Sequence, residues 1–202
     1  MYAFNAETGA FSKPKKEGEM KVNEIILSAA SLIGYYEQVK DYIDGEGEDG
    51  ATVTELLLRC FNLVENELAL DYLPLVAEEE KVTNAGKIVY SGLKNSIVRM
   101  IRVTDEEGNS IAYQVFPDYL MTQTGKVHIV YSYTPTPKTI GDESDFTLYV
   151  STRMFEYGIL AEYFAAVGRF EEANVWDEKY KDAIEAAYRA QSGGRMPVRR
   201  WV

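Results

Sequence analysis

The chain is poor in the residue types on which most catalytic and redox chemistry depends. It has one cysteine, Cys60, and one histidine, His128, among 202 residues. A single cysteine excludes an internal disulfide and fits a reducing cytoplasm, and one histidine with one cysteine cannot form a zinc set. A Ser-His-Asp or Cys-His mechanism would have to use His128, which stands in a predicted strand on the face opposite Val127 and Ile129. We therefore expect a surface histidine, a core cysteine and no enzymatic activity.

Long apolar runs and a surplus of positive charge are also missing. No run approaches the ~20 apolar residues of a membrane-spanning helix. The first twenty residues lack the apolar segment of a secretory signal, and we expect a flexible arm over residues 1–19. The net charge of −11 would repel the phosphates that a nucleic-acid-binding protein must neutralise. We expect a protein that neither spans a membrane nor binds nucleic acid in general.

Two helices are predicted before residue 75, because apolar residues recur there at spacings of three and four. The first runs from Lys21 to Ile43. The second begins at a capping box formed by Thr52 and Glu55 and ends before Pro74. We expect this second helix to be buried on two sides, because its apolar stripe is widened by Leu58, Leu63 and Leu70.

Two further helices are predicted near the C-terminus. One covers residues 148–167 and stops at Gly168, a residue suited to a left-handed helix cap. The other covers residues 170–190. Its predicted inward-facing residues are Phe170, Ala173, Trp176, Tyr180, Ile184, Ala187 and Tyr188.

Between residues 76 and 137 the apolar period changes to two, which predicts four or five antiparallel strands. The segment 105–109 predicts a hairpin turn in which Gly108 supplies a positive φ. Gly125 opens the last strand, and two prolines close it.

The order of these elements predicts an α+β fold. We expect a four-helix bundle, made of two N-terminal and two C-terminal helices, with an inserted antiparallel β-sheet or small sandwich. The predicted parts are the arm (1–19), the first helix pair (20–75), the inserted β region (76–140), the second helix pair (141–192) and an extended C-terminal tail (193–202).

The segment between the first two helices is strongly acidic. Residues 45–50 spell G-x-G-x-x-G, but a helix precedes them and their acids would repel a phosphate, so we expect no nucleotide. Counted from Asp44 to Glu55, the segment resembles a calcium loop, except that Asp49 stands where such a loop needs glycine. The main expectation is an acidic loop at a subunit contact or channel lumen, made of Asp41, Asp44, Glu46, Glu48 and Asp49.

The last eight residues, RMPVRRWV, carry the opposite charge. Arginine and tryptophan are the residue types that dominate hot spots at protein interfaces. The composition therefore favours a docking role for this tail. The predicted docking residues are Arg195, Pro197, Val198, Arg199, Arg200 and Trp201.

Three segments resemble the head–tail adaptor, or head-completion, proteins of tailed bacteriophages. They are ELLLRCFNLVENELALDYLPL (55–75), GKIVYSGLKNSIVRMIRV (86–103) and FEYGILAEYFAAVGRFEEANVWDEKYKDAIEAA (155–187). The third segment, hinged at Gly168, is the most similar. The β insert is longer than in the smaller, nearly all-helical adaptors.

The resemblance implies a structural virion protein without cofactor or catalysis. It would form a twelve-fold ring of identical copies below the dodecameric portal protein, complete the DNA-filled head and bind a neck or tail-completion protein. Genomic DNA would pass without specific binding, which an acidic lumen favours. The tail would contact the portal. The protein would lie at the head–tail interface of the virion, and in the host cytoplasm during assembly.

Two alternative functions come from the residues rather than from the resemblance. The first is a soluble intracellular protein-binding module, modulated by calcium through the 44–55 loop. The second, ranked last, is a small hydrolase that would use acidic clusters such as Asp142, Glu143 and Asp145, or Glu171 and Glu172.

Overall fold

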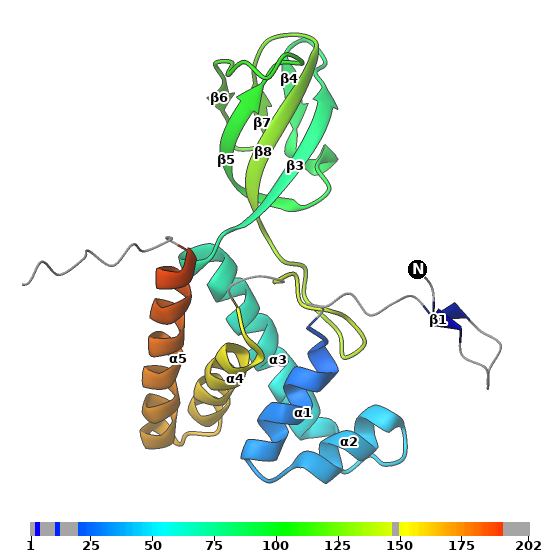
Figure 1. The fold of residues 1–202 in the computed structure, drawn as a ribbon, viewed down its shortest axis with the longest axis vertical. Helices are drawn as coiled ribbons and strands as arrows, with labels where there is room; N and C mark the ends of the chain where they lie inside the picture. Colours follow the sequence, from blue (N-terminus) through cyan, green and yellow to red (C-terminus); the bar gives the residue numbers. More distant parts are fainter. Residues whose placement is uncertain (1–2, 5–10, 13–19, 147–149, 192–202) are drawn as a thin grey trace, which may run out of the picture.

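A helical body carries a β insert that projects from one end (Figure 1). The structure is a computed structural model and describes residues 3–4, 11–12, 20–146 and 150–191. The body elements are α1 (Val22–Leu32), α2 (Tyr36–Asp44), α3 (Ala51–Glu67), the π-helical turn η1 (Leu68–Tyr72), α4 (Thr152–Ala166) and α5 (Phe170–Gln191). A short antiparallel pair, β1 (Ala3–Phe4) and β2 (Phe11–Ser12), precedes them. The fold is α+β, as predicted.

The single helix predicted over residues 21–43 is wrong, because the chain turns at Gly34. Gly34 has φ 79°, and its N–H donates to the Ser31 carbonyl at 3.4 Å. The Tyr35 N–H donates to the Ala30 carbonyl at 2.9 Å, which completes a Schellman motif at the end of α1. A separate short helix, α2, follows, and a four-helix bundle is therefore not confirmed.

The capping box predicted from Thr52 and Glu55 is also wrong. The residue before α3 is Gly50, which has no side chain to cap the helix. A Cβ at Gly50 would lie 2.0 Å from the carbonyl oxygen of Gln38, so this close approach to α2 requires glycine. The Thr54 hydroxyl donates to the Gly50 carbonyl at 2.8 Å and ties the first turn together.

Only one side of α3 is buried. Leu57, Phe61 and Val64 lie in the core and Leu58 is half-buried against it, whereas Leu63 and, in the following turn η1, Leu70 are exposed. The predicted second buried side is therefore wrong, and this face of α3 is open in the single chain.

The helix hinge predicted at Gly168 is confirmed. Gly168 has φ 78° and separates α4 from α5. Residues 148–149 of the predicted third helix lie outside the described residues. Phe170 and Tyr188 were predicted to face inward, but Phe170 is 67 % exposed and Tyr188 is also exposed. Phe170 is the first residue of α5.

The core of the body is built around α4, which contacts α1, α3 and α5. The rings of Phe61 and Phe155 stack with their centroids 5.0 Å apart. A Cβ at Gly158 would lie 2.8 Å from Val64 Cγ1 and 3.0 Å from Tyr180 Cε2. Glycine at this position lets three helices meet without a clash.

Six strands form the β insert, one more than the upper end of the prediction. They are β3 (Leu75–Val82), β4 (Lys87–Val89), β5 (Ser96–Thr104), β6 (Gln114–Val115), β7 (Tyr119–Met121) and β8 (Lys126–Thr134), with a 3₁₀ turn, η2 (Tyr90–Gly92), after β4. They make two antiparallel sheets, ordered β3-β8-β5 and β4-β7-β6. One apolar cluster, which includes Leu120, Ile129 and Tyr131, draws residues from both sheets.

The turns predicted within the insert are confirmed. The Asp105 N–H donates to the Asn109 carbonyl at 3.0 Å, and Gly108 between them has φ 86°. Gly125 has φ 130° just before β8, and β8 ends immediately before Pro135.

Candidate functional site

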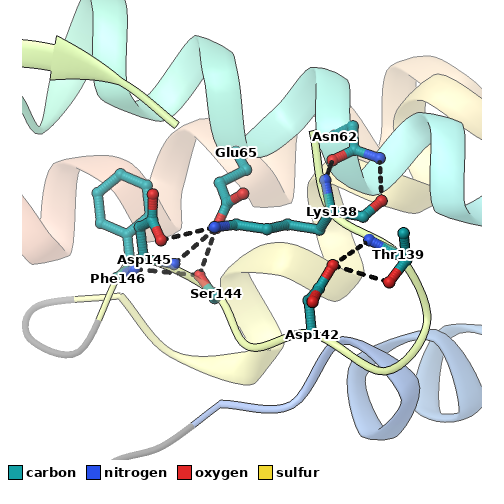
Figure 2. Close-up of polar contacts among 8 residues, drawn as sticks. All are labelled: Asn62, Glu65, Lys138, Thr139, Asp142, Ser144, Asp145 and Phe146. Carbon is teal, nitrogen blue, oxygen red and sulfur yellow. Dashed lines mark hydrogen bonds and ion pairs between the residues drawn. The ribbon is translucent and has the colours of Figure 1, made fainter. Parts of the chain in front are cut away.

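The segment that leads from β8 back to α4 joins the β insert to the helical body (Figure 2). Its first contact with α3 is a reciprocal pair of hydrogen bonds. The Lys138 N–H donates to Asn62 Oδ1 at 2.6 Å, and Asn62 Nδ2 donates to the Lys138 carbonyl at 3.1 Å. One side chain of α3 thus satisfies both backbone groups of one residue in the segment.

The second contact with α3 is a buried carboxylate. Glu65 is 1 % exposed, and its Oε1 accepts the Ser144 hydroxyl at 2.7 Å and the Asp145 N–H at 2.9 Å. The other oxygen, Oε2, is buried and has no hydrogen-bond partner among the described residues. We call Asn62, Glu65, Lys138, Ser144 and Asp145 the joint.

Charge in the joint is partly balanced. Lys138 Nζ lies 2.6 Å from Asp145 Oδ1, and the Lys138 side chain is almost buried. Burial raises the pKa of the Glu65 carboxyl, and the hydrogen bonds from Ser144 and Asp145, with the nearby charge of Lys138, oppose that rise. A buried carboxylate of this kind is costly unless its hydrogen bonds are kept.

The same segment is also bound to the start of α1. The Val22 N–H donates to the Asp142 carbonyl at 3.1 Å, and the Ser144 N–H donates to the Met20 carbonyl at 2.9 Å. The Asp142 carboxylate accepts the N–H and the hydroxyl of Thr139 at 2.6 and 2.8 Å. The segment is therefore fixed to two helices before it reaches α4, and it holds the exit of the β insert in one place.

Residues with potential for covalent or metal chemistry are not gathered into a site. His128 is partly exposed, and its Nε2 lies 3.4 Å from Glu78 Oε2. Cys60 is in the core, as predicted, and burial raises its pKa to about 12. Within the described ranges, no group of three or more histidine, cysteine or acidic residues could hold a metal ion. The calcium alternative through the 44–55 segment stays a prediction.

The predicted acidic loop is only partly a loop, because Asp41 and Asp44 lie in the last turn of α2. Glu46, Glu48 and Asp49 lie in the connection from α2 to α3, at the end of the body far from the insert (Figure 1). The backbone of this connection is closed by hydrogen bonds to the Asp41 carbonyl, which include one from the Glu46 N–H at 2.8 Å. All five predicted acidic side chains, Asp41, Asp44, Glu46, Glu48 and Asp49, are exposed.

The predicted docking tail, Arg195, Pro197, Val198, Arg199, Arg200 and Trp201, lies outside the described residues. The helix that leads to it, α5, ends on the side of the body from which the insert projects (Figure 1). No helix of the described residues is both long and apolar enough to cross a membrane.

The joint was missed by the sequence interpretation. A signal was present, because Glu65 stands four residues after Phe61 and three before Leu68, both of which are buried. A carboxylate on the apolar stripe of a helix needs a partner from elsewhere in the chain. The partners, Ser144 and the Asp145 N–H, are distant in sequence and carry no pattern that identifies them.

No protein-family model matches the chain, and no curated protein is significantly similar to it. A proposal of function must therefore depend on the geometry, the charge and the resemblance of the three segments.

Proposed function

We propose that the chain is a structural protein of a tailed-phage virion, a head–tail adaptor. In this proposal, copies form a ring below the portal, complete the filled head and connect it to the neck or tail. The observation that carries the proposal is the joint, which fixes a β insert to a helical body through buried hydrogen bonds.

A fixed joint suits a connector better than it suits an enzyme or a flexible binding module. A connector must hold one contact surface at a constant distance and angle from another. Here the exit of the insert is bound to α3 through Asn62 and Glu65, and to the start of α1 through Met20 and Val22. These contacts oppose rotation of the insert on the body.

The distribution of charge also supports the proposal. The chain carries a net charge of −11, and an acidic ring would let DNA pass without binding it. The exposed acidic loop is a candidate lining for the lumen or for a subunit contact. The arginines and Trp201 of the tail supply the residue types that bind a carboxylate-rich or apolar pocket on a portal.

A pull-down tests the proposal. The tagged protein is recovered from a lysate of the cells that produce it, bound proteins are identified by mass spectrometry, and the eluate is imaged by negative stain. We expect portal protein and rings, or rings attached to heads. Recovery of a lone monomer without virion proteins would contradict the proposal.

A further inference from the structure

We propose that neighbouring copies associate through the β insert, with the β3 edge of one copy against the β5 edge of the next. This inference depends on the proposed function only for the closure of the contacts into a ring. β3 and β5 are the two outer strands of the sheet β3-β8-β5 (Figure 1). Among the described residues, the outer side of β3 pairs with no strand, although the side chains of Glu79 and Lys81 bond the 92–94 segment. β5 bonds a short return at Ser110 and Ile111 near its end, and a groove separates its first half from residues 113–117.

The β3 edge combines apolar and acidic residues. Val76 and Val82 are 52 % and 78 % exposed. Between them on the same exposed face lie Glu78 and Glu80, whose side chains are 60 % and 63 % exposed and contact neighbouring groups of β8, His128 at 3.4 Å and Lys126 at 2.7 Å. Exposed valines on a strand edge are a liability for a single chain, and flanking charges restrict which partner the edge accepts.

The β5 edge combines apolar and basic residues. Val98 and Ile101 are 48 % and 44 % exposed, and Arg99 and Arg102 are exposed as well. Neither arginine has an ion-pair partner within the described ranges. Register shifts between Ile97 and Arg99 and between Met100 and Arg102 break the alternation of β5, which is how adjacent residues come to be exposed together.

A groove runs beside the β5 edge and offers space for a side chain from a neighbour. It has a volume of about 390 Å³. Its lining includes Val98, Arg99, Tyr113, Val115 and Pro117. Apolar residues together with Arg99 line this groove, which suits an edge that presents valines next to glutamates.

The register of the sheet places the acidic residues of β3 and the basic residues of β5 at matching positions along the strands. Glu78 and Arg102 both face Val130 of β8, one from each side, and Val76 and Arg99 both face Ser132. β3 and β5 run in the same direction, because each is antiparallel to β8. A second copy can be placed beside the first by a shift in the plane of the sheet, perpendicular to the strands. The β3 strand of the second copy then lies next to β5 of the first, and its Glu78 lies opposite Arg102.

Charge also decides the symmetry of the contact. A two-fold contact of β3 with β3 would place acids against acids, and a contact of β5 with β5 would place arginines together, and both are unfavourable. The complementary contact is heterologous, and repeated heterologous contacts generate closed rings or filaments. In a closed ring neither edge remains open.

Cysteine cross-linking tests the contact even if the association is weak. One preparation carries Glu78→Cys and another carries Arg102→Cys, and the two are mixed under mild oxidation. Cys60 does not compete because it is buried. The control replaces Glu78→Cys with Glu178→Cys, at an exposed position on α5. We expect the 78–102 dimer to form about tenfold faster than the control dimer, because docking raises the effective concentration of the pair. Equal rates would overturn the inference.

Charge reversal provides the second arm. One variant carries Glu78→Lys and Glu80→Lys, and the other carries Arg99→Glu and Arg102→Glu. Each alone should lose the wild-type self-association, measured by sedimentation velocity at high protein concentration, because its two edges then carry the same sign. An equimolar mixture should regain it, as should one chain with all four changes. Association by either single variant at the wild-type level would refute the contact, and thermal melts confirm that each variant is folded.

The outcomes separate this inference from the proposed function. Rings on the portal together with a 78–102 rate no higher than the control would refute the β3–β5 contact alone. A specific 78–102 cross-link in a protein that never binds a portal would refute the adaptor function and leave the contact as a self-association surface.

Discussion

Replacement of Glu65 by alanine should weaken the attachment of the β insert to the body. The change removes the acceptor of two buried donors, the Ser144 hydroxyl at 2.7 Å and the Asp145 N–H at 2.9 Å. Each buried donor left without a partner costs about 1–3 kcal/mol. The alanine variant no longer buries the Glu65 carboxylate, and the free energy gained by avoiding that desolvation offsets part of the cost. We therefore expect Glu65→Ala to lower the free energy of unfolding by about 2–4 kcal/mol.

The isosteric change Glu65→Gln separates the hydrogen bonds from the charge. Glutamine keeps an oxygen that accepts from Ser144 and Asp145, so Glu65→Gln should be clearly more stable than Glu65→Ala. Burial raises the pKa of Glu65 above its ordinary value of 4.5. The folded state thus holds this proton more tightly than the unfolded chain does. The contribution of Glu65 to stability is greatest below pH 4.5 and is lost as the pH rises through the folded pKa.

Urea denaturation of the wild type and both variants, at a series of pH values, measures these effects. The other carboxyl groups are common to the wild type and Glu65→Gln. The difference between their free energies of unfolding, wild type minus variant, should therefore fall as the pH rises from 4.5. The control, Glu55→Ala, changes an exposed acid on the same helix and should shift stability by less than about 0.5 kcal/mol. If Glu65→Ala matched that control, the joint would not fix the insert as argued.

Three further predictions follow from other parts of the chain. Gly158→Ala should lower the free energy of unfolding by about 1–3 kcal/mol, because its Cβ would lie 2.8 Å from Val64 Cγ1; a thermal melt as stable as wild type would contradict this packing. Deletion of residues 195–202 should leave the melting temperature unchanged and abolish portal recovery in the pull-down, and a truncated protein that still binds the portal would refute the docking tail. Calcium should leave the melting temperature unchanged, whereas a rise that disappears in Glu46→Gln with Glu48→Gln would favour the calcium-modulated alternative.

Two glycines show how far local sequence predicts the helical body. Gly34 and Gly168 both end a helix with a positive φ. Gly168 was predicted as a hinge, because glycine suits the left-handed cap that ends a helix. Gly34 was missed, because the apolar spacing continues across it to Val39, which is buried in the same core. Periodicity alone cannot separate one long helix from two helices that pack against one core.

Tertiary contacts explain the remaining errors. Thr52 and Glu55 form a plausible capping box in sequence, but the close approach of Gly50 to Gln38 sets the start of α3. Leu63 and Leu70 widen the apolar stripe, yet the single chain leaves them exposed. The turns of the insert were predictable, because Gly108 and Gly125 occupy positions that need a positive φ. The joint was not predictable, because Asn62 and Glu65 precede the β insert in the sequence whereas their partners at residues 138–145 follow it.

The most direct test of the adaptor function is the position of the protein on the particle. A gold label on a tagged copy, imaged on intact virions by electron microscopy, reports that position without any assumption about the interface. We expect label at the junction of head and tail, and no label there once residues 195–202 are deleted. Label spread over the capsid, or absent from virions that contain a complete neck, would contradict the adaptor function.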